Sequence, residues 1–362
     1  MSNPIAETVH KIASSEPFQE RFRGNCRFEH VCLAAQAFVA ACSVIHFGSR
    51  SCWVACPDVR RQEELFNGLL NWGVGTLFFP EIEAPAIEGA VPDAEIVAER
   101  LEVLNRLARG ERAVVVVTTA SLDDRVASRD TLSRQTRVLR RGEKLDRDAL
   151  FESLLKAGYD QVHQVSTRGQ FGVRGGIIDI FSAQMTLPVR IELFGDEIES
   201  IREFDLDEQT SIQVIDSCEI LAGPPEPAAE LLREYIGPED VVIDVESGLD
   251  KATVHITSSA YSLDEVEDYT TAFFESGFQD FEAGDFLVEE IKREAALDQL
   301  RKWIAEKWEL LAICHNEGEI ERLGDVLGDN EVDVEVVRFV VGNLNHGFIY
   351  PTARLALLDP IL

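Results

Sequence analysis

The chain has 362 residues, of which 45% are hydrophobic and 27% charged, and its formal net charge at pH 7 is −31. This length and composition predict two or three globular domains and exclude a disordered chain. The longest apolar stretches are far shorter than the roughly 20 residues that cross a membrane. The first residues also lack the pattern of a secretory signal, so we expect a cytoplasmic protein that does not bind membranes.

The acidic residues concentrate in the last third of the chain. The net charge is −5 for residues 1–133, −3 for residues 134–212 and −23 for residues 213–362. Binding of nucleic acid by bulk electrostatics requires a basic surface, so this charge argues against it. The acidic third either adds solubility or repels the DNA backbone, and the sequence leaves both alternatives open.

The seven cysteines show no metal-binding or redox pattern. None of them forms a CxxC pair, and the histidines lie far from any paired spacing, so we expect no metal site. Cys52 and Cys56 flank the apolar residues "WVA", which favours two structural cysteines in a buried strand.

Residues 30–120 alternate between helical and strand patterns, which predicts parallel strands in an α/β layer. In the helix expected at 92–110, Asp93 is the predicted N-cap and Gly110 the C-terminal stop. Its apolar face comprises Ile96, Val97, Leu101, Leu104 and Leu107. The other expected elements are helices at 34–45 and 59–72 and strands at 52–56, 75–79 and 113–119.

Residues 165–215 read instead as strands joined by short turns. Gly195-Asp196 is the expected turn of a hairpin within "PVRIELFGDEIESIREFD". In its first strand Val189, Ile191 and Leu193 share one face, and Arg190, Glu192 and Phe194 share the other. We therefore expect the second face to be exposed to solvent.

The α/β pattern returns after this segment. "VVIDV" at 241–245 is an apolar strand, which predicts a β-rich domain inserted into an α/β domain. A further α/β unit follows, in which Asn316 and Glu319 form a predicted helix cap. Its expected elements are helices at 287–308 and 317–329 and strands at 309–316, 332–341 and 347–350.

No nucleotide site or catalytic group is predicted. The string GxxxxGK[ST] of a phosphate-binding loop is absent, and the glycine-rich "GQFGVRGG" at 169–176 does not match it. Asp244 and Glu246 follow a buried strand, and we interpret them as two solvated acids rather than a magnesium site. The residues "HITSS" at 255–259 lack the turn of a strained nucleophile.

The most distinctive residues are Arg174, at a glycine-flanked turn, and Arg190 and Phe194 on the exposed strand face. One interpretation is an ordinary sheet face, on which Arg190 pairs with Glu192 or Asp179. The other is a protein-interaction site, because arginine and exposed aromatic side chains are enriched in binding hot spots. The residues alone leave both open.

The segment "RGQFGVRGGIIDIF…LPVRIELFGDEIESIREFDLDEQTSI" resembles the inserted domain shared by the excision-repair protein UvrB and the transcription-repair coupling factors (Mfd). "FFPEIEAPAIEGAVPDAEIVAERLEVLNRLARGE" and the final "HGFIYPTARLALLD" are similar to segments of Mfd in particular. The abrupt end at "LLDPIL" suggests a piece of a larger protein, and the likeness suggests its N-terminal, UvrB-homology module.

The resemblance implies a fold. A degenerate P-loop-like parallel α/β domain would be interrupted by an inserted antiparallel β-rich domain and followed by a small α/β domain. The implied boundaries are 1–124 and 213–288 for the two halves of the UvrB-like domain, 125–212 for the inserted domain and 289–362 for the small domain.

The resemblance also implies a function. The inserted domain of this family docks onto UvrA through two arginines and a phenylalanine, which correspond here to Arg174, Arg190 and Phe194. The expected role is recruitment of UvrA to stalled RNA polymerase without catalysis, metal or cofactor in this chain. Polymerase and DNA contacts and the ATP- and Mg-dependent translocase of the family lie in parts absent from this sequence. Two alternatives are a UvrB-type ATP-dependent enzyme and an autoinhibitory scaffold that docks onto the C-terminal domain of its own protein.

Overall fold

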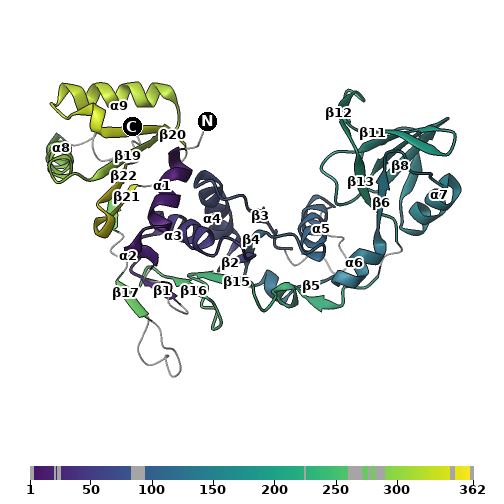
Figure 1. The fold of residues 1–362 in the computed structure, drawn as a ribbon, viewed down its shortest axis with the longest axis horizontal. Helices are drawn as coiled ribbons and strands as arrows, with labels where there is room; N and C mark the ends of the chain where they lie inside the picture. The colour runs from purple at the N-terminus through teal and green to yellow at the C-terminus, as the bar shows by residue number, and fades with distance from the viewer. Residues whose placement is uncertain are drawn as a thin grey trace. The chain divides into compact units, whose positions relative to one another are not determined.

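The computed structural model describes residues 4–19, 22, 26–82, 94–223, 226–259, 272–275, 279–281, 290–342 and 347–358. It divides the chain into two compact units, of which one comprises residues 1–77, 114–119 and 238–362. The other unit comprises residues 78–113 and 120–237. Each unit has its own sheets and its own hydrophobic core (Figure 1).

The first unit is built on a seven-stranded sheet with the order β17-β1-β16-β15-β2-β4-β3. The pairings that join β17, β1, β16, β15, β2 and β4 are all parallel. Strands that precede and follow the second unit in sequence thus lie in one sheet. The strands are β1 (Cys26–Glu29), β2 (Cys52–Cys56), β3 (Leu77–Phe78), β4 (Val114–Thr118), β15 (Val241–Val245), β16 (Val254–Ile256) and β17 (Ala272–Glu275).

Helices α1 (Pro4–Ala13), α3 (Leu33–His46) and α4 (Val59–Asn71) lie together beside this sheet, and the short α2 (Glu16–Gln19) follows α1 (Figure 1). The apolar side chains of α1, α3 and α4 share one core with β1, β2 and β15. Asp58 caps α4, because its carboxylate accepts a hydrogen bond from the backbone N–H of Arg61 at 2.9 Å.

Helices α3 and α4 approach closely at Gly68. A Cβ atom added to this glycine would lie 2.6 Å from Cβ of Ala37. We expect Gly68→Ala to lower the free energy of unfolding by about 1–3 kcal/mol, because the helices must separate. The matched control is Gly324→Ala on α9 (Glu317–Asp329), where the nearest atom would be 4.0 Å away. That change is expected to stabilise by up to about 1 kcal/mol through helix propensity. Equal effects in chemical denaturation would contradict the prediction.

The same unit contains a five-stranded sheet with the order β18-β21-β22-β19-β20. β19 pairs in parallel with β20 and β22, whereas β21 is antiparallel to β22 and β18. Asn316 caps α9 by accepting a hydrogen bond from N–H of Glu319 at 3.0 Å. The elements are β18 (Gln279–Phe281), α8 (Glu290–Ala305), β19 (Glu309–Cys314), α9 (Glu317–Asp329), β20 (Val337–Val341), β21 (Gly347–Tyr350) and β22 (Leu355–Leu358).

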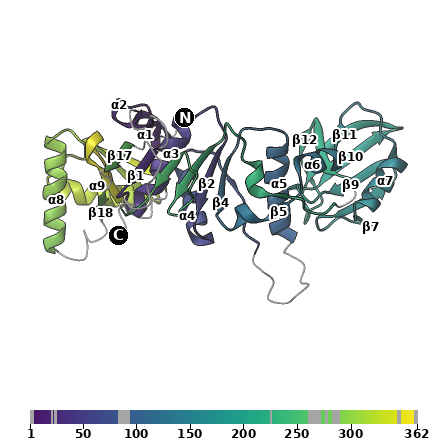
Figure 2. The same cartoon turned by 90° about the horizontal axis from the view of Figure 1, so that it is seen from below.

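The second unit contains a six-stranded sheet with the order β12-β11-β10-β9-β8-β7. Four of its pairings are antiparallel, and β7 runs parallel to β8. Helix α7 (Arg147–Lys156) lies beside β7 and β9 and covers the core face of the sheet (Figure 2). The strands are β7 (Asp160–Val162), β8 (Gln170–Arg174), β9 (Ile177–Phe181), β10 (Val189–Phe194), β11 (Glu197–Phe204) and β12 (Ser211–Ile215).

Two further strand pairs and two helices complete the second unit. β6 (Thr136–Arg140) pairs with β13 (Ser217–Leu221), and β5 (Arg125–Val126) pairs with β14 (Glu230–Leu231). The helices are α5 (Ala94–Ala108) and α6 (Arg129–Gln135). This compact unit therefore extends beyond residues 125–212 on both sides.

Most elements agree with the sequence-based expectations. The mixed α/β class, the parallel pairing of the early strands and the absence of helix in 165–215 are confirmed. Gly110 lies just beyond the end of α5 with φ of +69°, as a C-terminal stop requires. The expected N-cap Asp93 lies outside the described residues. None of the described helices is long and apolar enough to cross a membrane.

A candidate protein-interaction surface

Two tight hairpins build the surface that carries the predicted site. Gly175-Gly176 connects β8 to β9, and Gly195-Asp196 connects β10 to β11. Gly175 has φ of +61° and Gly195 has φ of +65°, values that favour glycine because other residues are strained there. Gly175 and Gly176 thus form the turn, whereas Gly172 lies within β8, and the predicted glycine-flanked turn beside Arg174 is confirmed.

Strand pairing places the three predicted residues on one face of the six-stranded sheet. Arg190 lies opposite Asp179 on β9 and opposite Arg202 on β11, and Arg202 lies opposite Val214 on β12. Gly172 lies opposite Asp179, so Arg174 shares this face by strand alternation. We call this side, with Arg174, Arg190, Phe194, Arg202 and Val214, the arginine face.

The opposite side of the sheet is the core. Ile178, Ile180, Val189, Ile191 and Ile201 are buried there and pack with apolar side chains of α7. The alternation predicted for β10 is therefore confirmed.

Arg190 is held firmly within the arginine face. Its Nε donates to Oδ1 of Asp179 at 2.7 Å and its Nη2 donates to Oδ2 at 2.9 Å, which is a bidentate ion pair. The guanidinium also lies 4.6 Å from the ring centroid of Phe204, and Nη1 donates to the carbonyl of Gln209. The hydrogen bonds to Asp179 raise the pKa of Arg190. Of the two predicted partners, the structure selects Asp179, which is 3% exposed.

Arg174 and Phe194 are much more exposed to solvent than Arg190. The side chain of Phe194 is 80% exposed at the end of β10. Arg174 is exposed beside the first turn, where its Nε and Nη2 donate to the carbonyl of His163 at 3.1 and 2.7 Å. These two bonds fix the guanidinium without neutralising it, because a carbonyl has no net charge. Arg174 and Phe194 can therefore contact a partner directly.

Two further residues of the arginine face, Arg202 and Val214, were not predicted from the sequence. Arg202 forms an ion pair with Glu192 at 3.1 Å, and a hydrogen bond from Ser200 also reaches that carboxylate. Ile212 and Val214 on β12 are 53% and 61% exposed. The sequence signal for Val214 was the alternation in "SIQVI", but only the pairing of β11 with β12 places Val214 opposite Arg202 on this face. The register of this pair shifts between Gln213 and Ser211, so the pairing does not assign Ile212 to a face.

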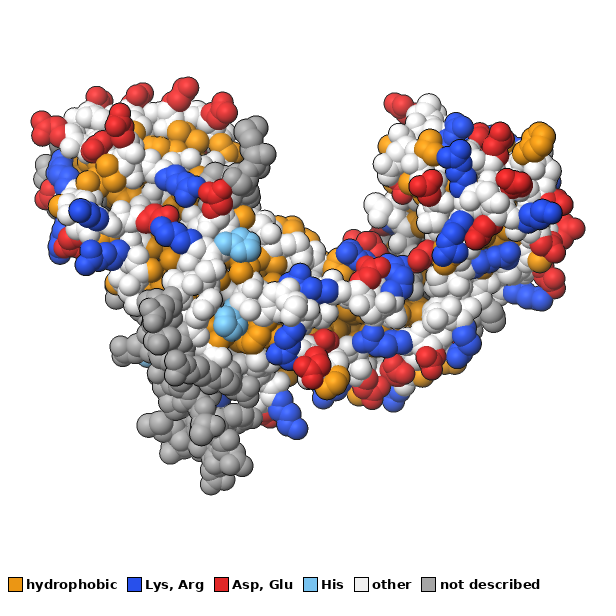
Figure 3. Space-filling model, in the orientation of Figure 1, with side chains coloured by type: hydrophobic (Ala, Val, Ile, Leu, Met, Phe, Trp, Pro, Cys, Tyr) orange, Lys and Arg blue, Asp and Glu red, His pale blue; other side chains and the backbone are white. Residues whose placement is uncertain are grey.

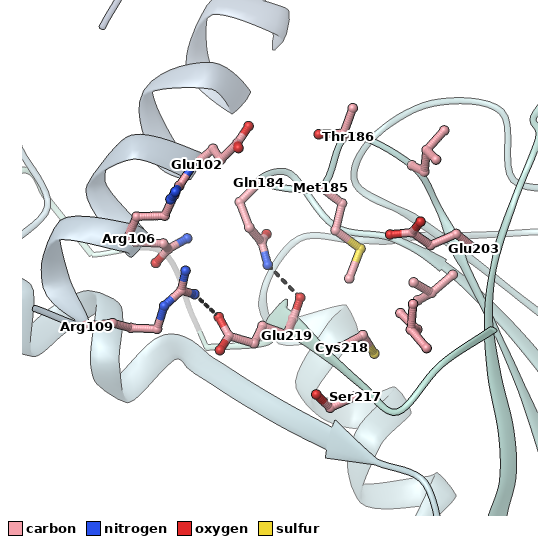
Figure 4. A pocket seen from close by; sticks show the side chains of 14 residues that line it. Glu102, Arg106, Arg109, Gln184, Met185, Thr186, Glu203, Ser217, Cys218 and Glu219 are labelled. Carbon is pink, nitrogen blue, oxygen red and sulfur yellow. Dashed lines mark hydrogen bonds and ion pairs between the residues drawn. The ribbon is translucent and has the colours of Figure 1, made fainter. Parts of the chain in front are cut away.

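A hollow of about 240 Å³ lies next to α5 in the same unit (Figure 4). Arg109 forms an ion pair with Glu219 at its wall, and Nε2 of Gln184 donates to the carbonyl of Glu219 at 2.8 Å. Burial raises the pKa of Cys218 to about 12, so its thiol stays protonated at neutral pH and is a poor nucleophile. Cys218 is therefore not an activated nucleophile in this hollow.

Polar side chains of the chain itself form hydrogen bonds at the carboxyl edge of the parallel sheet in the first unit. Glu246, directly after β15, accepts hydrogen bonds from Nε2 of Gln36 at 2.8 Å and from N–H of Ser258. Arg61 donates to Oε1 of Gln36. A phosphate-binding loop would lie at this edge in a nucleotide-binding relative. These hydrogen bonds engage the Glu246 carboxylate within the chain itself.

The prediction of two solvated acids after β15 is wrong for Asp244. This residue is fully buried, and its Oδ2 lies 3.1 Å from Nδ1 of the buried His255 on the neighbouring strand β16. Its Oδ1 accepts hydrogen bonds from N–H and Oγ of Ser247. A local sequence pattern could not predict this burial, because the partner His255 lies on a different strand.

We expect Asp244→Ala to lower the free energy of unfolding by about 3 kcal/mol, because His255 loses a buried partner. Denaturant titration measures this loss. Asp325→Ala is the control, since that carboxylate is exposed on α9 and should change stability by less than about 0.5 kcal/mol. A similar small effect in both variants would contradict a structural role for the Asp244–His255 pair.

Within the described parts of the chain, no group of three or more His, Cys, Asp and Glu side chains could hold a metal ion. All seven cysteines are free, and Cys52 and Cys56 are buried in β2 as predicted.

Comparison with known proteins identifies the kind of domain that carries the arginine face. Residues 138–224 match a family described as the UvrB interaction domain. This stretch includes β8 to β12 and all residues of the arginine face.

The relatives are transcription-repair-coupling factors. The one from Bacillus subtilis is 37% identical over 176 residues, which are 48% of this chain and 14% of the relative. Those from Escherichia coli and Haemophilus influenzae are 36% identical over 146 residues and 32% identical over 169 residues. The predicted resemblance to the UvrB-homology module of Mfd is confirmed, and the matched part spans only about a seventh of these relatives.

Proposed function

We propose that this chain is the part of a transcription-repair coupling factor that recruits UvrA in nucleotide excision repair. The exposed Phe194 on the arginine face carries the proposal, because a large aromatic side chain that is 80% exposed beside arginines is typical of a binding hot spot. Arg174 and Phe194 contact UvrA, and Arg190 fixes the sheet between them. Arginine suits this role because its planar guanidinium pairs with carboxylates in two-pronged geometry.

The proposed domains have the boundaries that the family resemblance implies. Residues 125–212 form the inserted UvrA-binding domain, and 1–124 and 213–288 form the two halves of a degenerate UvrB-like domain. Residues 289–362 form the small α/β domain. The seven-stranded sheet, with strands from both sides of the arginine face in sequence, supports this arrangement.

The chain itself acts without catalysis or cofactor in this proposal. The missing phosphate-binding loop supports it. Contacts with RNA polymerase and DNA, and the ATP-driven displacement of polymerase, belong to other parts of the whole protein, which works in the cytoplasm. A row of acidic side chains over α9 disfavours DNA contact there (Figure 3).

The test is isothermal titration calorimetry of residues 1–362 against UvrA from the same organism. We expect saturable binding that UvrB displaces, since both proteins would use the same kind of domain. The absence of a binding signal from a folded chain, verified by circular dichroism, would refute the proposed function.

A further inference from the structure

Strand β12 is an open edge of the six-stranded sheet. Among the described residues it pairs only with β11, and its residues 211–214 are all exposed. Its sequence "SIQVI" contains no charged residue and no proline. The opposite edge, β7, is only three residues long and carries Asp160. Natural proteins protect edge strands with charges, proline, short length or β-bulges. β12 has neither a charge nor a proline, and the register of its pairing with β11 shifts between Gln213 and Ser211, which leaves Val214 and Ile215 in regular pairing.

The exposed side chains of β12 also continue the arginine face. Val214 lies directly opposite Arg202, which lies opposite Arg190. The row Asp179, Arg190, Arg202 and Val214 thus crosses four neighbouring strands on one side of the sheet. Figure 3 shows hydrophobic side chains at the surface beside Lys or Arg side chains in the region of β11 and β12.

We propose that β12 is a second contact for UvrA, which adds an extended segment to this edge of the sheet. In this arrangement the backbone of the added strand pairs with β12, and its apolar side chains cover Ile212 and Val214. A carboxylate of the same segment meets Arg202, whose side chain is 38% exposed. This inference rests on the proposed function and extends its surface from Phe194 to the sheet edge.

A second copy of the chain is a weaker occupant than UvrA. The edge offers five residues, so pairing of two β12 strands alone would bury much less than the roughly 1,200 Å² typical of a stable interface. A partner that already covers Phe194 and Arg174 would add the contact with β12 to a larger interface on the same face. The small area that two paired β12 strands would bury therefore favours UvrA as the occupant of this edge.

The test compares Ile212→Thr/Val214→Thr with wild type in calorimetry against UvrA. Threonine keeps the β-branched shape, so the edge strand should persist while the apolar contact is lost. We expect the dissociation constant to rise about tenfold. Leu155→Thr is the matched control, since Leu155 is 54% exposed on α7, on the core side of the sheet. It should bind like wild type.

Hydrogen exchange adds a readout of strand addition. Amides of residues 211–215 should become protected when UvrA binds, and those of α7 should not. Unchanged exchange in β12 and an unchanged dissociation constant, in a chain that still binds UvrA, would overturn this inference and leave the proposed function intact. Failure of wild type to bind would refute both. Dimerisation of wild type that the double variant abolishes would assign β12 to a second copy instead.

Discussion

Arg190→Ala should lower the free energy of unfolding by about 3 kcal/mol, a large share of the stability of a domain of this size. The reason is Asp179, whose side chain is only 5% exposed and whose carboxylate receives both hydrogen bonds from Arg190. Removal of the guanidinium leaves a buried charge without its partner. Thermal and denaturant unfolding measure the loss.

Two variants separate this effect from a general loss of surface charge. Arg202→Ala removes an arginine from the next strand, but its partner Glu192 is 30% exposed, so we expect a loss below about 1 kcal/mol. The double variant Asp179→Ala/Arg190→Ala should be more stable than the sum of the single effects implies, because neither charge is left alone. Equal losses for Arg190→Ala and Arg202→Ala would contradict this account.

The ion pair between Arg190 and the buried Asp179 also affects the interpretation of binding by Arg190 variants. Weaker binding of Arg190→Ala to UvrA would reflect a disturbed sheet as well as a lost contact. Arg190 is therefore a positioning residue in the proposed site, whereas Arg174 and Phe194 have no buried carboxylate partner in the described structure.

Local patterns were sufficient to predict most of the fold. The two-residue turn at Gly195-Asp196, the buried strand β4 and the cap at Asn316 follow from periodicity and turn chemistry, which act over a few residues. The candidate site could be predicted to the same extent, because alternation along β10 separates Arg190 and Phe194 from Val189 and Ile191.

The features that the sequence did not predict depend on contacts between residues far apart in sequence. The apolar face predicted for α5 does not include Arg100 and Asn105, but both are buried. Arg100 donates to the carbonyl of Pro80 and to Asp124, both at 2.9 Å. Burial lowers its pKa. The helical periodicity of residues 92–110 cannot predict these partners, because they lie elsewhere in the sequence. Local patterns also could not predict the pairing of Asp244 with His255 or the position of β12 at the edge of its sheet.

Phe194→Ala should weaken binding to UvrA about 30-fold, which corresponds to about 2 kcal/mol for an aromatic hot spot. Its 80% exposure means that the truncated side chain removes little from the core, so the thermal midpoint should stay within about 1 °C of wild type. Calorimetry against UvrA and thermal unfolding of the same preparation provide the two measurements.

Arg174→Ala should likewise weaken binding without loss of stability, with a smaller affinity loss of about tenfold. Its guanidinium is exposed and, among the described residues, donates hydrogen bonds only to the carbonyl of His163. Arg140→Ala is the matched control, since Arg140 is 58% exposed on β6 and lies outside the arginine face. A charge effect on the association rate alone would weaken binding in both variants and would disappear at high salt. A specific contact predicts a loss in Arg174→Ala that persists at high salt and is absent in Arg140→Ala.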